Sequence, residues 1–219
     1  MKNKTLKSFP EITEVVSPDK FKKIWEEVSL DVQKNKAKAH RLSEEMANQC
    51  FEELSRRPFY LAHLAQEMGA KNIAEVGTAQ GLQYFSFAEA VRDSNGHVWS
   101  CDIKDDRNQE YVEKYKDDTT FCLGTSEVLA TRLREDDVKI DMFYIDGAHG
   151  RGDVVKDVIR LREFQSDNPI WVFDDYDDRF GCYEDIKRLI NNKKDVKIYR
   201  VGNAASGNPN HQVIVRGKY

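Results

Sequence analysis

Two polar residues directly follow a short apolar segment near the middle of the chain. Residues 141–150 read Asp-Met-Phe-Tyr-Ile-Asp-Gly-Ala-His-Gly, and their apolar half is typical of a buried strand in a parallel sheet. Because Gly147 ends this pattern, Asp146 and His149 should lie at the carboxyl end of the strand, where open α/β sheets bind their ligands. A carboxylate and an imidazole at this spacing can hold a metal ion and accept a proton. Taken alone, the segment fits a capped turn with an exposed histidine equally well.

A second group of acids follows another apolar segment. Residues 170–173 lead directly into Asp174 and Asp175, the first two of an acidic run that extends to residue 178. On a neighbouring strand end, these carboxylates would lie within reach of the same hard cation as Asp146. Close carboxylates without a cation repel each other and one pKa rises, so a site this acidic is costly unless it is used. We therefore predict a divalent cation at Asp146, Asp174 and Asp175, with a solvated acidic turn as the alternative.

Two earlier strand ends indicate a nucleoside site. The first predicted strand runs into residues 75–81, Glu-Val-Gly-Thr-Ala-Gln-Gly, and then directly into a helix. Gly77 and Gly81 allow a tight turn and the close approach of a ligand, but their spacing matches neither a dinucleotide fingerprint nor a phosphate loop. Asp102 ends the next strand, where an acid can accept hydrogen bonds from both ribose hydroxyls. Together they predict an adenosine-type cofactor without a pyrophosphate; a plain turn and a solvated carboxylate are the alternatives.

The third predicted strand ends at Gly124, Thr125 and Ser126, whose small side chains leave room for an adenine ring. A simple helix cap explains Thr125 or Ser126 equally well.

The chain from residue 71 onward alternates strand and helix patterns, which is typical of right-handed crossovers in a doubly wound parallel sheet. Residues 196–201 and 212–215, joined by a turn-rich loop, should add an antiparallel hairpin. The predicted fold is α/β, a Rossmann-like, doubly wound, seven-stranded sheet that is mostly parallel. The other strands are predicted at residues 72–76, 97–103, 119–123, 140–145 and 170–173, and helices at 82–92, 108–116, 127–134, 153–164 and 184–192.

Extra helices are predicted before this sheet. Residues 1–16 show little periodicity, and Ser17-Pro18-Asp19 begins a helix. An amphipathic stripe over residues 42–56 is ended by Arg57 and Pro58, and a third helix covers residues 59–68 with Gly69 as its C-cap. We therefore divide the chain into an N-terminal arm with helices (1–57) and a cofactor-binding domain (58–219). The N-terminal helices either cover the substrate or pack against the sheet or a second subunit, as in a homo-oligomer.

Composition limits the class of protein. With 219 residues the chain is long enough for one sizeable core, and a net charge of −4 gives no basic excess for binding nucleic acid. No apolar run approaches the length of a membrane span, and no signal core follows the N-terminal lysines, so we expect a cytoplasmic protein without membrane contact. The four cysteines have no ligand spacing and are expected to be reduced and structural.

Taken together, these residues resemble the class I S-adenosylmethionine-dependent methyltransferases, from about residue 59 to the C-terminus. Within that class the sequence is most similar to the small-molecule O-methyltransferases of the macrocin and methyltransferase-24 type and to the cephalosporin-hydroxylase-like proteins. The family's fourth-strand signature, phenylalanine and isoleucine followed by Asp-Gly-x-His, is matched from Phe143 to His149, and its fifth-strand acids by Asp174 and Asp175.

The resemblance implies transfer of a methyl group from S-adenosylmethionine to a substrate hydroxyl, with Mg²⁺ held by Asp146, Asp174 and Asp175. It places a base at His149, where catechol-type relatives have a lysine, and an imidazole with a pKa near neutrality can accept the proton. The acidic run is long, which leaves the second and third ligands open to exchange with Asp177 or Asp178. The implied cofactor-binding residues are Glu75, Gly77, Thr78, Gly81, Asp102, Ile103, Thr125, Ser126 and Asp146.

We therefore predict a Mg-dependent O-methyltransferase that acts on a hydroxyl of a small molecule such as a sugar or polyhydroxylated metabolite. A metal-independent methyltransferase for another acceptor is the first alternative. A non-catalytic module for cofactor binding or assembly is the second, and the presence of both a base candidate and a full set of acids disfavours it.

Overall fold

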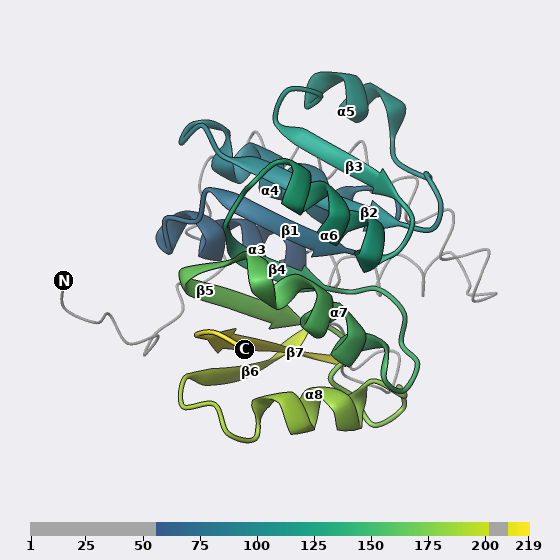
Figure 1. Cartoon of the computed structure of the whole chain (residues 1–219), viewed down its shortest axis with the longest axis vertical. Helices are drawn as coiled ribbons and strands as arrows, with labels where there is room; N and C mark the ends of the chain where they lie inside the picture. The colour runs from purple at the N-terminus through teal and green to yellow at the C-terminus, as the bar shows by residue number, and fades with distance from the viewer. Residues whose placement is uncertain (1–55, 202–209) are drawn as a thin grey trace.

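Seven strands form one mixed sheet in the part of the chain that the structure describes. The computed structural model describes residues 56–201 and 210–219. The strands lie in the order β3-β2-β1-β4-β5-β7-β6, with β7 antiparallel to both β5 and β6 and all other neighbours parallel (Figure 1). This confirms the predicted doubly wound sheet with its C-terminal antiparallel hairpin. The strands are β1 (Asn72–Val76), β2 (His97–Asp102), β3 (Thr119–Leu123), β4 (Ile140–Ile145), β5 (Gln165–Phe173), β6 (Val196–Val201) and β7 (Asn210–Arg216).

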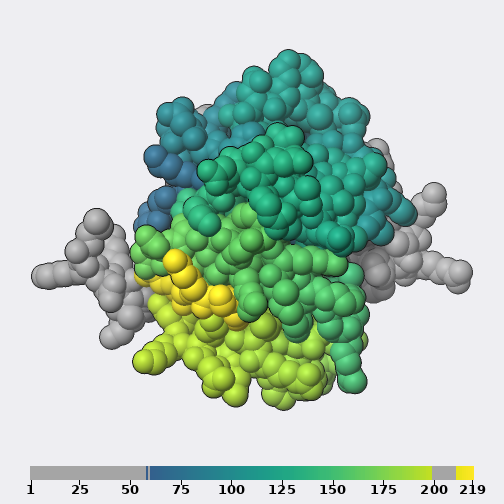
Figure 2. Space-filling view, viewed as in Figure 1, coloured from purple at the N-terminus to yellow at the C-terminus, as the bar shows by residue number. Residues whose placement is uncertain are grey.

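Helices cover both faces of this sheet. Figure 1 shows α6, α7 and α8 in front of the strands and α3 and α4 behind them, and in the space-filling view the front helices largely hide the strands (Figure 2). The helices are α3 (Arg56–Glu67), α4 (Leu82–Arg92), α5 (Gln109–Lys114), α6 (Ser126–Glu135), α7 (Asp153–Leu161) with the short 3₁₀ helix η2 (Arg162–Phe164), and α8 (Tyr183–Ile190).

The central strand β4 shows why both faces need a helical layer. Its side chains alternate, so that Met142 and Tyr144 pack on the α3–α4 side while Phe143 and Ile145 pack on the α6–α8 side. On the second side, the rings of Phe143 and Trp171 of β5 stack with centroids 3.9 Å apart. The continuous apolar sequence of residues 142–145 in β4 therefore reflects burial on both faces.

The structure corrects several element boundaries, and three of these corrections have a clear physical reason. The helix α3 begins at Arg56 and not at residue 59, and Pro58 lies inside its first turn, where the missing N–H needs no partner. The predicted end of the preceding helix lies outside the described residues. Strand β5 begins at Gln165, five residues before the predicted start at residue 170. The prediction was late because the exposed residues 167–168 interrupt the apolar pattern of the strand. Strand β2 ends at Asp102, which leaves Ile103 beyond the strand and 72% exposed.

Some predictions lie outside the described residues. These are the arm over residues 1–16, the helices predicted before residue 56, Cys50 and the loop over residues 202–209. The other cysteines, Cys101, Cys122 and Cys182, are buried free thiols, as expected of structural cysteines. Among the helices that the structure describes, none has both the length and the hydrophobicity needed to cross a membrane.

The packing of the first turn predicts that Gly77 tolerates no side chain. Its φ is 97°, and a Cβ there would lie 2.0 Å from the carbonyl oxygen of Asp146. Gly77→Ala should therefore lower the free energy of unfolding in urea by more than the roughly 1–2 kcal/mol that a left-handed φ alone costs. The matched control is Gly69→Ala, since Gly69 has a φ of 66° but no described atom within 4 Å of its Cβ position. Equal losses in the two variants would contradict the steric explanation.

Candidate active site

The carboxyl ends of the parallel strands meet at one edge of the sheet, and hydrogen bonds extend the ladder beyond them. Gly77 N–H donates to the carbonyl of Cys101 at 2.9 Å, and Asp146 N–H donates to the carbonyl of Val76 at 2.8 Å. Asp174 N–H donates to the carbonyl of Ile145 at 3.0 Å. The turns after β1, β4 and β5 therefore begin at fixed positions next to one another.

A pocket of about 450 Å³ opens at this edge. It brings together predicted cofactor residues from four strand ends and adds residues of α7. Glu75, Thr78 and Gly81 do not line it; they lie in or beside the turn that forms its wall. The lining residues are Val76, Gly77, Cys101, Asp102, Ile103, Gly124, Thr125, Ser126, Asp146, Gly147, Ala148, Asp153, Lys156, Asp157 and Arg160.

Polar contacts hold the glycine turn. The fully buried Glu75 accepts a hydrogen bond from the Ser100 hydroxyl at 2.5 Å, and the Ser100 hydroxyl lies 2.5 Å from that of Thr78. On the solvent side, Ala79 N–H donates to Asp102 Oδ2 at 2.8 Å. Asp102 therefore ties the turn after β1 to the end of β2, and a carboxylate has lone pairs left for ribose hydroxyls.

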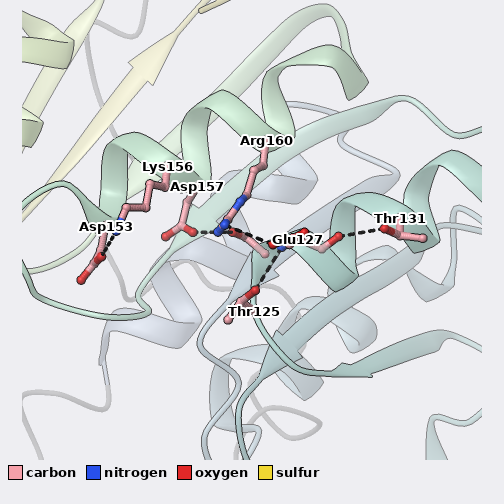
Figure 3. A network of polar contacts seen from close by, with 8 residues as sticks. Thr125, Glu127, Thr131, Asp153, Lys156, Asp157 and Arg160 are labelled. Atoms are coloured by element: carbon pink, nitrogen blue, oxygen red, sulfur yellow. Dashed lines mark hydrogen bonds and ion pairs between the residues drawn. The ribbon is translucent and has the colours of Figure 1, made fainter.

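The turn between β3 and α6 both caps a helix and lines the pocket, which are the two alternatives that the sequence left open. Thr125 caps α6 by accepting from Glu127 N–H, and it also lines the pocket. The Ser126 hydroxyl donates to Asp157 at 2.5 Å and accepts from Arg160 at 3.0 Å, and Figure 3 shows Asp157 and Arg160 approaching this turn from α7. Sequence reasoning missed Asp157 and Arg160.

A tyrosine hydroxyl connects two of the predicted metal ligands. Tyr144 is buried, and its hydroxyl lies 2.7 Å from Asp146 Oδ2 and 3.0 Å from Asp174 Oδ2. Asp174 also accepts from Asp175 N–H at 2.9 Å, so each of its carboxylate oxygens has a donor. Asp174 is thus fixed beneath the site, while Asp146 is only half-buried.

The histidine pairs with the second strand-five acid. His149 Nε2 lies 2.6 Å from Asp175 Oδ2, and the edge of the His149 ring packs on Phe180 with centroids 5.1 Å apart. The Asp175 hydrogen bond raises the pKa of His149, against an opposing effect of partial burial. Asp175 has a φ of 55°, a left-handed conformation that is uncommon for residues other than glycine. Such strain is typical of functional sites.

Three groups lie close enough to share one ion. Ligand atoms of Asp146, His149 and Asp175 all lie within 4.8 Å of one another. Two of the three predicted ligands are therefore brought together, with His149 in the position predicted for Asp174. Asp177 pairs with Arg179 at 2.6 Å and lies outside the cluster. Two carboxylates and an imidazole suit several divalent cations.

Comparison with known proteins identifies a matching family. Residues 74–176 match the model of a family described as a methyltransferase domain. No curated protein matches the chain.

Solved structures share the fold at low identity. An O-methyltransferase from Bacillus cereus in complex with SAH has a TM-score of 0.65 and 18% identity, over 90% of this chain and 91% of that one. The O-methyltransferase TomG from Streptomyces achromogenes, involved in tomaymycin synthesis and in complex with SAM, has a TM-score of 0.64 and 14% identity, over 94% and 92%. An rRNA methylase from Streptococcus thermophilus has a TM-score of 0.53 and 10% identity, over 71% and 95%.

The buried Tyr144 hydroxyl is predicted to stabilise the site. Tyr144→Phe removes the single hydroxyl proton that the carboxylates of Asp146 and Asp174 share and should lower the free energy of unfolding by about 1–3 kcal/mol, measured in urea. In the matched control Tyr219→Phe, the hydroxyl that is removed is buried and has no hydrogen-bond partner among the described residues, so stability should change little. A loss in the control as large as in Tyr144→Phe would contradict this role.

The pairing of His149 with Asp175 predicts a pH dependence. Because the folded-state pKa of His149 is raised, the stability that the pair contributes is fully present below about pH 6.5, the ordinary histidine pKa. That contribution is lost as the pH rises through the raised pKa. Asp175→Asn should bring the pKa of His149 down in an NMR titration, and its stability difference from wild type should shrink at high pH. Asparagine tolerates the φ of 55°, which limits other effects.

The internal control is His97, whose pKa is lowered mainly by burial and which lies on β2. The pKa of His97 should be the same in wild type and in Asp175→Asn. An unchanged pKa of His149 in Asp175→Asn would show that the two side chains do not interact in solution.

Proposed function

We propose that this class I S-adenosylmethionine-dependent methyltransferase transfers its methyl group to a hydroxyl oxygen of a small molecule, with the help of a divalent cation. The observation that carries the proposal is the position of Asp146. This residue lines the pocket that fits a cofactor and also belongs to the cluster with His149 and Asp175. A cofactor in the pocket would therefore have its reacting end beside groups that can bind and deprotonate a hydroxyl.

The pocket lining supports an adenosyl cofactor. Asp102 is positioned as acceptor for the ribose hydroxyls, and the exposed Ile103 offers an apolar surface for the adenine ring. Thr125 and Ser126 form the far end of the pocket. We assign the methionine end of the cofactor to Glu75 near the end of β1 and to the turn that follows, which contains Gly77, Thr78 and Gly81.

The donor set of the cluster fits a cation. Asp146 and Asp175 would supply the hard oxygen ligands that Mg²⁺ prefers, and Asp174 holds their surroundings through Tyr144 and the backbone of Asp175. A bound cation would supply Lewis acidity, which lowers the pKa of a coordinated hydroxyl.

His149 is the base in this proposal. With Nε2–H donated to Asp175, the ring keeps Nδ1 as its acceptor, and half of the side chain is exposed to an incoming substrate. The reaction breaks the methyl–sulfur bond, forms the methyl–oxygen bond and leaves S-adenosylhomocysteine. The hydroxyl proton goes to His149.

Two features bear on the acceptor. The O-methyltransferase structures of similar fold make a hydroxyl acceptor the first choice, and a cation favours a substrate with neighbouring oxygens, such as a sugar or polyhydroxylated metabolite. We further propose that residues 1–57 form a separate segment that covers the substrate or joins two subunits.

Two other functions stay open to test. A metal-independent methyltransferase for another acceptor would use the same cofactor pocket, and the rRNA methylase of similar fold shows that this architecture is not limited to small molecules. A non-catalytic module would bind the cofactor without turnover.

Methyl transfer from labelled S-adenosylmethionine to a panel of catechols and sugars, with Mg²⁺ or with a chelator, tests the proposal. We expect turnover that the chelator abolishes and that His149→Gln lowers by about 100-fold or more. Asp175→Asn should lose turnover yet bind S-adenosylhomocysteine normally, because Asp175 does not line the pocket. Its matched control is Asp177→Asn, an acid from the same run that pairs with Arg179 and should leave turnover unchanged.

Each alternative has its own outcome. Full turnover in the chelator would support the metal-independent enzyme. Binding of S-adenosylhomocysteine without turnover of any acceptor would support the non-catalytic module. Absence of cofactor binding would refute all three.

A further inference from the structure

Asp157 is a buried carboxylate that the proposed reaction does not use. It lies on α7, whose Val154, Val158 and Leu161 pack against the sheet, and its spacing places it on the same face of the helix. Its side chain is part of the pocket wall, although the residue is only 8% exposed. An acid within an apolar helical stripe is costly unless donors satisfy it.

Within residues 56–201 and 210–219, only one of the two Asp157 oxygens has a donor. Oδ1 accepts from the Ser126 hydroxyl at 2.5 Å, and Figure 3 shows the other oxygen directed away from that contact. Among the described residues, none donates a hydrogen bond to Oδ2. Burial raises the pKa of Asp157 in spite of the Ser126 hydrogen bond and the charge of Arg160, as expected of a carboxylate with too few donors.

The neighbouring cations are held by other acids. Lys156 pairs with Asp153 at 3.0 Å, and Arg160 pairs with Glu127 at 3.3 Å while donating to the Ser126 hydroxyl. Ser126 has given its single proton to Asp157, so its hydroxyl is not a donor for a ligand. Asp157 Oδ2 is therefore a charged acceptor at this end of the pocket.

We propose that Asp157 Oδ2 accepts a hydrogen bond from the exocyclic amino group of the cofactor's adenine and thereby selects adenosyl over other purine nucleosides. The inference rests on the proposed function, which places the ribose at Asp102 and the adenine ring on Ile103, and it directs the edge of that ring toward Thr125 and Ser126 at the far end of the pocket. The amino group is the only donor on the edge of adenine in a nucleoside, and an ionised carboxylate only accepts. Hypoxanthine has a carbonyl at that position, which would face the carboxylate oxygen unfavourably.

Calorimetry on the full-length protein with S-adenosylhomocysteine and S-inosylhomocysteine tests the inference without any turnover. Wild type should bind the adenosyl compound about tenfold or more tightly, the usual value of a hydrogen bond to a charged group. In Asp157→Asn, whose amide can donate as well as accept, the preference should fall to near unity or reverse. The matched control is Glu163→Gln, which neutralises an exposed acid directly after the same helix that does not line the pocket and should keep the wild-type preference.

The outcomes separate this inference from the proposed function. If wild type binds neither compound, the proposed function fails and the inference with it. If wild type binds both compounds equally, or if Asp157→Asn keeps the wild-type preference, the inference alone is overturned. The wild-type comparison needs no variant, so a poorly folded Asp157→Asn protein would still leave a decisive result.

Discussion

The close packing of Gly77 against the backbone of Asp146 holds the two halves of the site together. A Cβ at Gly77 would lie 2.0 Å from the Asp146 carbonyl oxygen, and directly before it Val76 accepts from Asp146 N–H at 2.8 Å. The turn that forms the cofactor wall and the turn that carries Asp146 and His149 therefore have one fixed separation. Group transfer depends on such positioning, because errors of about 1 Å between reacting atoms can cost about 100-fold in rate.

The acids of the site are stable because each is held by specific donors. Tyr144 reaches Asp146 and Asp174, a backbone N–H reaches Asp174, and His149 reaches Asp175. Burial without these donors would favour protonated carboxylates, which bind cations poorly. The left-handed φ of Asp175 is the conformational cost of turning its carboxylate toward His149 while Asp174 points beneath the site. The backbone strain at Asp175 therefore lowers local stability while it fixes the position of the carboxylate beside His149.

The sequence predicted the fold well because its strands are short, apolar and bounded by breakers. Residues 140–145 and the turn from Gly77 to Gly81 were located correctly, and so were the acids that follow β4 and β5. The start of β5 was missed because its first residues include exposed polar ones, whose place in the sheet depends on pairing with β4. The start of α3 was predicted three residues late because a proline is typical both of the end of one helix and of the first turn of the next, and only the backbone distinguishes the two.

Side-chain partners were harder to predict than positions. Tyr144 fits an apolar strand pattern, and its contact with two strand ends depends on the register that pairs it with Val172 and Glu75. Which of the adjacent Asp174 and Asp175 meets His149 depends on a local φ that no periodicity reveals. Asp157 did carry a signal, since it interrupts the apolar stripe of α7, but its partner Ser126 is distant in the sequence.

The exposure of the site residues indicates from which side each substrate would approach. Glu75 is fully buried, Asp146 is half-buried and the His149 side chain is 49% exposed, so accessibility rises from the glycine turn toward the histidine. A cofactor in the pocket would lie over the turns after β1, β2 and β3. An acceptor that delivers its hydroxyl to His149 would instead lie toward the segment between β5 and α8, where Phe180 packs on the His149 ring. The two substrates then meet at Asp146, the residue common to the pocket and the acidic cluster.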